Sequence, residues 1–329
     1  MSAIETDRLT KRFRQLRGYR DVARYARQTP TRLAVDEISL EVADGELFGL
    51  LGENGAGKTS LIRMLSTTLV PTSGSARVGG FDVDREAHEV RGIIGLVGGD
   101  ERSFYWRLTG QQNLEYFATL YHVPRRVALD RITRLLSTLG VTEYADLRFD
   151  SYSTGTKQKF AIARGLLTEP RILFLDEPTR ALDPIAADEV RRYVVDHVVG
   201  ELGTTVLIAT HTLAEAESIC DRIGILRHGR LFAAGTMAEL TTSMSLSKVF
   251  EVVALGDRSR LEEAVAGIEV GDLSVTADGE RSVIRLRPDR RPDAINEVLG
   301  AVLASGAIVE SSTTRRPTLD DVYRAVHAS

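Results

Sequence analysis

The amino-acid sequence predicts an α/β protein that carries a smaller α+β domain at its C-terminal end. Residues 47–65 have the pattern of a buried strand, a glycine-rich loop and a helix in direct succession. Residues 172–175 form a second short apolar strand, which ends in two acidic residues. After Gly235 the pattern changes to short strands and helices, which predicts a separate unit.

Length and composition place the chain among globular proteins. Its 329 residues are 43% hydrophobic and 27% charged, and its net charge of −4 gives no overall preference for nucleic acid or membrane. The single cysteine, Cys220, excludes an internal disulfide and fits a reducing cytosol. No signal peptide is expected, and no run approaches the roughly 18 apolar residues of a membrane span, so any role at a membrane is expected to be peripheral.

A phosphate-binding loop is the strongest motif. The sequence G-E-N-G-A-G-K-T follows the strand of residues 47–51 and precedes a helical pattern, which is the context that the motif requires. Its glycines let backbone N–H groups wrap a phosphate, its lysine can reach the β- and γ-phosphates, and its hydroxyl can bind Mg²⁺. The predicted nucleotide contacts are Gly52, Glu53, Asn54, Gly55, Ala56, Gly57, Lys58, Thr59 and Ser60, with Thr59 also a predicted metal ligand. A glycine-rich turn without a ligand is the less favoured alternative.

The acidic pair after residues 172–175 is a second candidate part of the site. Open α/β sheets bind ligands at the carboxyl ends of their strands. Asp176 is therefore a predicted metal ligand, and Glu177 is predicted to polarise a water for attack on the γ-phosphate. The alternative is an acidic pair that only ends a strand before Pro178, but the phosphate-binding loop in the same chain favours a hydrolytic site.

These motifs resemble, in their order along residues 5–238, those of the ATP-binding subunits of ABC transporters. The loop at 52–59 is similar to the Walker A loop, and residues 172–177 are similar to Walker B with its catalytic glutamate. Asp183 in A-L-D is similar to the D-loop aspartate, and His211 in I-A-T-H-T to the switch histidine. The resemblance implies a P-loop NTPase of the ABC type, with a mixed sheet core and a helical subdomain at about residues 104–168.

The stretch S-T-G-T at residues 153–156 resembles the signature motif of the same family. It precedes a helix-like run, and a helix N-terminus offers backbone N–H groups and a positive dipole end to an anion. Ser153 and Gly155 stand in the expected places, whereas Thr154 and Thr156 replace the usual glycine and glutamine. In this family the signature helix of one domain covers the γ-phosphate held by another, which implies a homodimer or a pair with a homologous ATPase subunit.

The resemblance also implies the function. Subunits of this family hydrolyse ATP and drive a separate transmembrane permease from the cytoplasmic face of the cell membrane. ATP and Mg²⁺ are then the expected cofactors, and Lys58, Glu177 and His211 the expected catalytic residues. The ending R-R-P-T-L-D-D-V-Y-R-A-V resembles the extensions of subunits that serve drug, antibiotic or lipid-linked exporters, so export is the expected direction.

Two features depart from the family pattern. Asp100 aligns with the usual glutamine that joins the metal site to the helical region, where its carboxylate is expected to bind the metal or its water; a plain acidic loop residue is the alternative. Phe13 aligns with the aromatic that stacks on adenine, and a basic insertion over residues 14–32 follows it. That insertion is expected to be either a basic amphipathic helix near anionic lipid or the membrane partner, or a solvated hairpin.

The helical region is expected to dock the transmembrane partner, and the aromatic cluster Phe104, Tyr105 and Trp106 at its entrance is expected to pack in its core, with a partner contact as the alternative. Residues 239–329 predict a small accessory domain after a polar linker at 241–247. Its expected strands and helices follow the order β-α-β-β-α-β of the ferredoxin-like motif, with a tail helix from Leu319. Dimer support or regulation is its expected role.

A soluble ABC ATPase that acts on ribosomes or nucleic acid is the alternative function. Translation-associated members carry two cassettes, and DNA-repair members carry a long coiled coil between P-loop and signature. This chain has one P-loop, and about 95 residues separate Lys58 from Ser153. The transporter function is therefore favoured, and no nucleic-acid partner is expected. A small-molecule kinase would leave the signature and the D-loop without a purpose.

Overall fold

The computed structural model describes residues 2–14, 31–98, 104–244, 246, 248–268, 273–279, 281–286 and 294–328. The chain folds as two compact units, Met1–Thr236 and Met237–Ser329. Each unit has a hydrophobic core of its own. Within the described ranges, none of the helices combines the length and the apolar character that crossing a bilayer requires.

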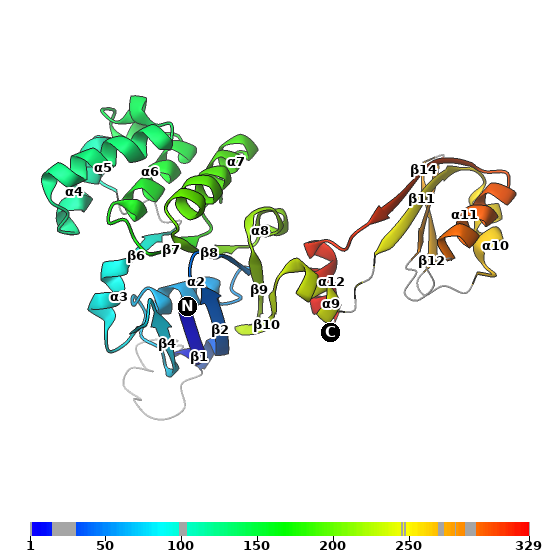
Figure 1. The fold of residues 1–329 in the computed structure, drawn as a ribbon, viewed down its shortest axis with the longest axis horizontal. Coiled ribbons are helices and arrows are strands. Elements are labelled where there is room, and N and C mark those ends of the chain that lie inside the picture. Colours follow the sequence, from blue (N-terminus) through cyan, green and yellow to red (C-terminus); the bar gives the residue numbers. More distant parts are fainter. Residues whose placement is uncertain are drawn as a thin grey trace, which may run out of the picture. The chain divides into compact units, whose positions relative to one another are not determined.

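A four-stranded antiparallel sheet begins the first unit (Figure 1). Its order is β2-β1-β4-β5, with β1 at Ser2–Arg14, β2 at Thr31–Ala43, β4 at Ser73–Val78 and β5 at Phe81–Asp82. Alternate residues of β2 are buried, including Ile38, Leu40 and Val42, which is the pattern of a sheet with one covered face. The β1–β2 pairing sets Phe13 opposite Arg32.

A six-stranded mixed sheet forms the centre of the first unit. Its strands, in the order in which they lie side by side, are β10 (Arg230–Gly235), β9 (Arg222–Arg227), β3 (Leu47–Leu51), β8 (Thr205–Thr210), β7 (Ile172–Asp176) and β6 (Ile94–Val97). The pair β10–β9 is antiparallel, and the other pairs are parallel. Every residue of β3 and β8 is buried, as expected for parallel strands covered on both faces. The predicted α/β class is confirmed. Because β3, β7 and β8 are parallel neighbours, their carboxyl ends meet at one edge.

Helices surround this sheet. The first unit contains α2 (Lys58–Leu65), α3 (Ala87–Ile93), α7 (Pro184–Tyr193), the π-helix η4 (Val194–Glu201) and α8 (Leu213–Ile219). Of these, α2 contacts β7 and β8, and α8 contacts β3. The loops that precede α2 and α8 follow β3 and β8 directly, so these helices begin at the sheet edge where the strands end.

A helical lobe follows β6. It consists of α4 (Gly110–Leu120), α5 (Arg125–Thr138), the short 3₁₀ turns η2 (Thr142–Tyr144) and η3 (Phe149–Ser151), and α6 (Thr154–Leu166) (Figure 1). Phe104 packs in its core, stacked on Phe149 at 4.3 Å between ring centroids. Tyr105 and Trp106 remain 50% and 60% exposed, so the prediction of core packing is wrong for these two residues.

The second unit contains a four-stranded antiparallel sheet. The strands are β11 (Val249–Leu255), β12 (Leu273–Asp278), β13 (Arg281–Leu286) and β14 (Ile308–Arg315), in the order β12-β13-β11-β14. Helices α10 (Arg258–Val265) and α11 (Ala294–Ala304) connect them, so that the connectivity is β-α-β-β-α-β. Phe250, Val252 and Ala254 of β11 form the core with both helices.

The second unit begins with α9 (Met237–Ser243) and ends with α12 (Leu319–Ala328), and these two helices contact each other. Residues 241–243 were expected in a polar linker, and that prediction is wrong because they belong to α9. The hydroxyls of Thr241 and Thr242 donate to the carbonyls of Met237 and Ala238, which satisfies both polar groups within the helix.

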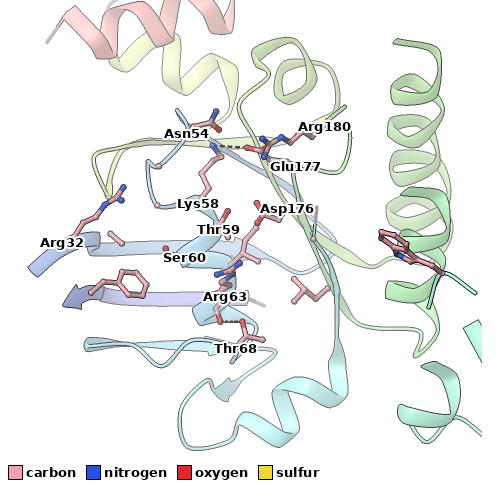
Figure 2. A pocket seen from close by; sticks show the side chains of 18 residues that line it. Arg32, Asn54, Lys58, Thr59, Ser60, Arg63, Thr68, Asp176, Glu177 and Arg180 are labelled. Atoms are coloured by element: carbon pink, nitrogen blue, oxygen red, sulfur yellow. Dashed lines mark hydrogen bonds and ion pairs between the residues drawn. The ribbon is translucent and has the colours of Figure 1, made fainter. Parts of the chain in front are cut away.

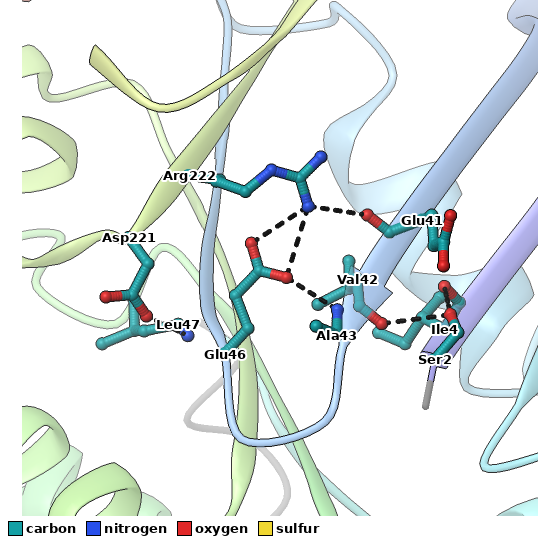
Figure 3. Close-up of polar contacts among 9 residues, drawn as sticks. All are labelled: Ser2, Ile4, Glu41, Val42, Ala43, Glu46, Leu47, Asp221 and Arg222. Atoms are coloured by element: carbon teal, nitrogen blue, oxygen red, sulfur yellow. Dashed lines mark hydrogen bonds and ion pairs between the residues drawn. The ribbon is translucent and has the colours of Figure 1, made fainter. Parts of the chain in front are cut away.

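An ion pair between the buried Glu46 and the partly exposed Arg222 joins the two sheets of the first unit (Figure 3). Glu46, which precedes β3, accepts from Arg222 of β9 at 3.2 Å and from the backbone N–H of Ala43 at 2.6 Å. Arg222 also donates to the carbonyl of Glu41 in β2 at 3.2 Å. The Glu46 side chain is buried, so these donors replace the water that its charge has lost.

Replacing Arg222 by alanine is expected to lower the free energy of unfolding by about 2–3 kcal/mol, because it leaves the Glu46 carboxylate buried without its charged partner. Chemical denaturation of the two proteins measures the difference. Arg192→Ala, which breaks the exposed pair with Asp188, serves as the control and is expected to change stability by less than about 1 kcal/mol. Equal effects of the two changes would contradict the anchoring role of Arg222.

Candidate functional site

A cleft of about 1320 Å³ opens at the sheet edge where β3 and β7 end (Figure 2). It extends from the β1–β2 hairpin across the glycine-rich loop to the end of β7 and the start of the helical lobe. The predicted residues that line it are Phe13, Asn54, Gly55, Gly57, Lys58, Thr59, Ser60, Asp176 and Glu177. Residues predicted separately from the β1, β3 and β7 segments of the sequence therefore share one cavity.

The glycine-rich loop depends on close backbone approaches. A Cβ on Gly52 would lie 2.5 Å from the carbonyl oxygen of Leu226, and a Cβ on Gly57 would lie 2.4 Å from that of Ala34. Gly57 also has a φ of +110°, which is unfavourable for residues with a side chain. The loop can wrap so tightly at the head of α2 because these positions carry no side chain.

Lys58 is the buried cation of the cleft. It is only 4% exposed, and its Nζ donates to the carbonyls of Gly52 at 2.6 Å and Glu53 at 3.1 Å. Burial lowers the pKa of Lys58, whereas the negative charges of Glu177 and Asp176 raise it. A charge held in this way, at the start of a helix, is the arrangement that binds phosphate groups.

Asp176 and Thr59 form the candidate metal position. Burial raises the pKa of Asp176, although a hydrogen bond from the Thr59 side chain acts in the opposite direction. Among the described residues, Oδ1 of Asp176 is buried without a hydrogen-bond partner. A carboxylate oxygen and a hydroxyl suit Mg²⁺, which commonly takes one or two protein ligands and completes its shell with phosphates and water. The residues present therefore fit the predicted ion.

Glu177 lies close to the nitrogen atoms of three side chains, those of Lys58, His211 and Arg180. Its Oε1 is 3.9 Å from Nζ of Lys58 and 3.3 Å from Nδ1 of His211, and its Oε2 is 3.3 Å from Nη1 of Arg180. Glu177 has a φ of +51°, a left-handed backbone that costs about 1–3 kcal/mol in a residue with a side chain. Its backbone N–H donates to Ala209 of β8 at 2.8 Å, and this bond helps to hold the strained position.

The signature and D-loop residues lie at two neighbouring helix starts. The Ser153 hydroxyl caps α6 and accepts from the N–H of Thr156 at 3.1 Å, and the Asp183 carboxylate caps α7. A Cβ on Gly155 would lie 3.3 Å from that of Ala186, so the two helix starts are in close contact. Ser153, Gly155 and Asp183 do not line the cleft that contains Lys58.

Three cationic residues of the cleft were not predicted as site residues. Arg32 lies opposite Phe13, with its Nη2 3.4 Å from the position of a Cβ on Gly55, and Arg63 follows Thr59 by one helical turn. Arg180 is the only charged residue between Glu177 and Asp183, a signal that could have identified it. The contact of Arg32 with the loop joins segments that are distant in sequence, so no local pattern marks it.

Two predictions fall on residues outside the described ranges. Asp100, the predicted replacement for the family glutamine, lies between residues 98 and 104. Residues 15–30 of the basic insertion also lie outside those ranges. The expected roles of Asp100 and of the insertion therefore stay predictions.

Comparisons with known proteins agree with this site. A family model described as "ABC transporter" matches residues 35–180. The daunorubicin resistance ATP-binding protein DrrA3 of Streptomyces coeruleorubidus is 40% identical over 290 residues, which cover 88% of this chain and 90% of that protein. The doxorubicin resistance ATP-binding protein DrrA of Mycobacterium tuberculosis is 34% identical over 301 residues, with 89% and 88% covered.

A solved structure shows the same similarity. The protein cbiO1 from Clostridium perfringens, part of the ABC transporter complex cbiONQ, aligns with a TM-score of 0.62 and 27% identity over 73% of this chain and 91% of its own. The similarity to the two resistance proteins covers nearly nine tenths of this chain. The predicted family and the predicted ATPase activity are confirmed. The chain belongs to the ATP-binding, ATP-hydrolysing subunits of the ABC transporter family.

Proposed function

We propose that the chain hydrolyses ATP at a site shared between two subunits and thereby powers a separate transmembrane permease in the direction of export. The observation that carries this proposal is the convergence of Lys58, Glu177 and His211 at one sheet edge. A cation for the phosphates, a carboxylate for the attacking water and an imidazole beside that carboxylate are groups that phosphoryl transfer to water uses.

In this proposal the cleft holds the nucleotide along its length. The ring of Phe13 stacks on adenine at the mouth, and the backbone N–H groups of residues 52–57 enclose the phosphates. Lys58 exchanges its bonds to the loop carbonyls for bonds to the β- and γ-phosphates. Thr59 and Asp176 would hold Mg²⁺, which would neutralise charge on the phosphates when bound.

Hydrolysis is assigned to residues at the ends of β7 and β8. Glu177 orients the attacking water and accepts a proton from it. His211 contacts Glu177 through Nδ1, so its other ring nitrogen is the one that we assign to the γ-phosphate. In this assignment Lys58 stabilises the negative charge of the phosphates while the bond between the γ-phosphoryl group and the leaving β-phosphate breaks.

Completion of the site is assigned to a second subunit, either another copy of this chain or a homologous ATPase. Ser153 and Gly155 lie outside the cleft of their own chain, yet they form a helix N-terminus, which is suited to an anion. Facing the partner's cleft, they would cover its γ-phosphate, with Asp183 beside them. ATP then becomes a contact between subunits that hydrolysis removes.

The names of the relatives support our proposals for the permease, the location and the class of cargo. Two of them are named for resistance to daunorubicin or doxorubicin, and cbiO1 belongs to a transporter complex. We assign this chain to the cytoplasmic face of the cell membrane, bound to a permease that exports a small organic molecule. Tyr105, which is exposed and does not line the nucleotide cleft, is available for that permease, whereas Trp106 lines the cleft.

Purification of the tagged full-length chain from its own membranes tests this function. The expected result is co-purification with a protein of several membrane spans, and an ATPase rate that changes when that protein is removed. A Tyr105→Ala variant that loses the membrane protein but keeps nucleotide binding would support docking at the helical lobe. Recovery with ribosomes or nucleic acid, without any membrane protein, would instead support the alternative function.

A further inference from the structure

A buried carboxylate on α8 bonds to the loop that carries the catalytic glutamate. Glu215 is only 1% exposed, and its Oε1 accepts from the Thr179 hydroxyl at 2.7 Å. Among the described residues, its Oε2 is buried without a hydrogen-bond partner. The Thr179 hydroxyl is therefore the neighbour that offsets the loss of water around this polar group.

The hydrogen bond joins the two segments that bear the reacting side chains. Thr179 follows Glu177 by two residues, and Glu215 follows His211 by four, in the first turn of α8. The carboxylate of Glu177 and the ring of His211 meet between these segments at 3.3 Å. A small cavity of about 150 Å³ separates the segments and is lined by Glu177, Thr179 and His211, among others.

The loop needs such an anchor because its backbone is strained at two points. Glu177 and Ala181 both have left-handed backbones, with φ of +51° and +62°. Backbone bonds hold part of the loop, from Glu177 to Ala209 at 2.8 Å and from Leu182 to Thr179 at 3.2 Å. Thr179 to Glu215 is the side-chain bond that ties the middle of this loop to the helix after His211.

We propose that Thr179 and Glu215 are a positioning pair that fixes the distance and orientation between Glu177 and His211. Neither residue touches the nucleotide in this role, and both act through the two side chains that they hold. The inference rests on the catalytic roles proposed above for Glu177 and His211. A pair that served packing alone would be as well served by apolar side chains of the same shape, without the cost of a buried carboxylate.

Thr179→Val tests the pair because valine keeps the shape of threonine and removes only the donor. The expected result is a kcat lowered by about 10-fold or more with the KM and the affinity for ATP unchanged, because misplacement affects chemistry before binding. The Tm is expected to fall modestly because the buried Glu215 side chain loses its donor, so the rates are compared well below that Tm. Thr179→Ser keeps the hydroxyl and is expected to restore most of the rate. Thr204→Val, which removes a buried hydroxyl that bonds to Pro170 outside both cavities, is the matched control.

Variants of Glu215 test the same hydrogen bond from the acceptor. Glu215→Gln keeps an oxygen that accepts from Thr179 and should retain most of kcat, whereas Glu215→Leu should lose as much as Thr179→Val, and the double variant no more than either. If Thr179→Val does not fold, Thr179→Ala against Thr179→Ser decides the question. Normal kcat in a folded variant without the donor overturns the inference. Full hydrolysis by a Glu177→Gln variant would instead overturn the proposed catalytic role of Glu177 on which this inference rests.

Discussion

Replacing Glu177 by glutamine is expected to lower the steady-state rate of ATP hydrolysis by about 10²- to 10⁴-fold, the usual contribution of a general base. Glutamine has almost the same shape, so the loop around Pro178 keeps its conformation, but the amide cannot take a proton from water. ATP binding should persist, and the ATP-bound dimer should accumulate because the step that releases it is blocked. Phosphate-release kinetics and size-exclusion chromatography with ATP measure both effects.

A matched control is available on the neighbouring helix. Glu217 is exposed on α8, two residues beyond the buried Glu215, and Glu217→Gln makes the same chemical change outside the cleft. Its rate is expected to equal that of the wild type. A Glu177→Gln variant that hydrolyses ATP at a normal steady-state rate would remove Glu177 from its assigned role and leave the base unidentified.

Two inactive variants of this chain are expected to regain activity when they are mixed. Lys58→Ala removes the buried cation and should weaken nucleotide binding by about 10- to 100-fold. Gly155→Asp sets a negative charge against the γ-phosphate of the partner's site. Because a Cβ at this position lies 3.3 Å from that of Ala186, Gly155→Ala, which adds the Cβ without the charge, is the control. A mixed dimer has one site with both defects and one intact site, so random mixing should restore about a quarter of the wild-type rate.

The mixing experiment separates a shared site from a self-contained one. If each chain completed its own site, the two defects would fall in different sites and no mixture would recover activity. Titrating one variant into the other while ATP hydrolysis is recorded gives the result directly. Dilution of the wild type is the control, because a shared site loses activity when its subunits separate, whereas a monomer keeps its specific rate.

The parts of the site that are contiguous in sequence could be predicted. The loop at residues 52–59 and the pair Asp176 and Glu177 each combine a short apolar strand with the polar groups that follow it, and the sheet brings these strand ends together. The small antiparallel sheet of the second unit could be predicted in the same way, since strand and helix periodicities alternate along the chain. Strand register, helix ends and the extent of β14 depend on contacts between distant segments, so the sequence predicts them less well.

The misses have physical causes. Tyr105 and Trp106 are large and apolar, which favours burial, but neighbouring positions on one segment cannot all face the same core, and Phe104 takes the interior place. Glu215 looks like an ordinary charge on an amphipathic helix, because its partner Thr179 is 36 residues earlier in the chain. Thr179 and Glu215 meet because β7 and β8, which precede them, are neighbours in the sheet. Local sequence patterns do not reveal which strands become neighbours.

The left-handed backbone at Glu177 has a consequence for how this enzyme could change over time. Glycine would relieve the torsional cost at that position, so thermodynamic stability and catalysis make opposite demands on one residue. A duplicated copy that no longer needs to hydrolyse ATP would gain thermodynamic stability if glycine replaced Glu177. Such inactive copies are then expected to form heterodimers with a subunit that still hydrolyses ATP.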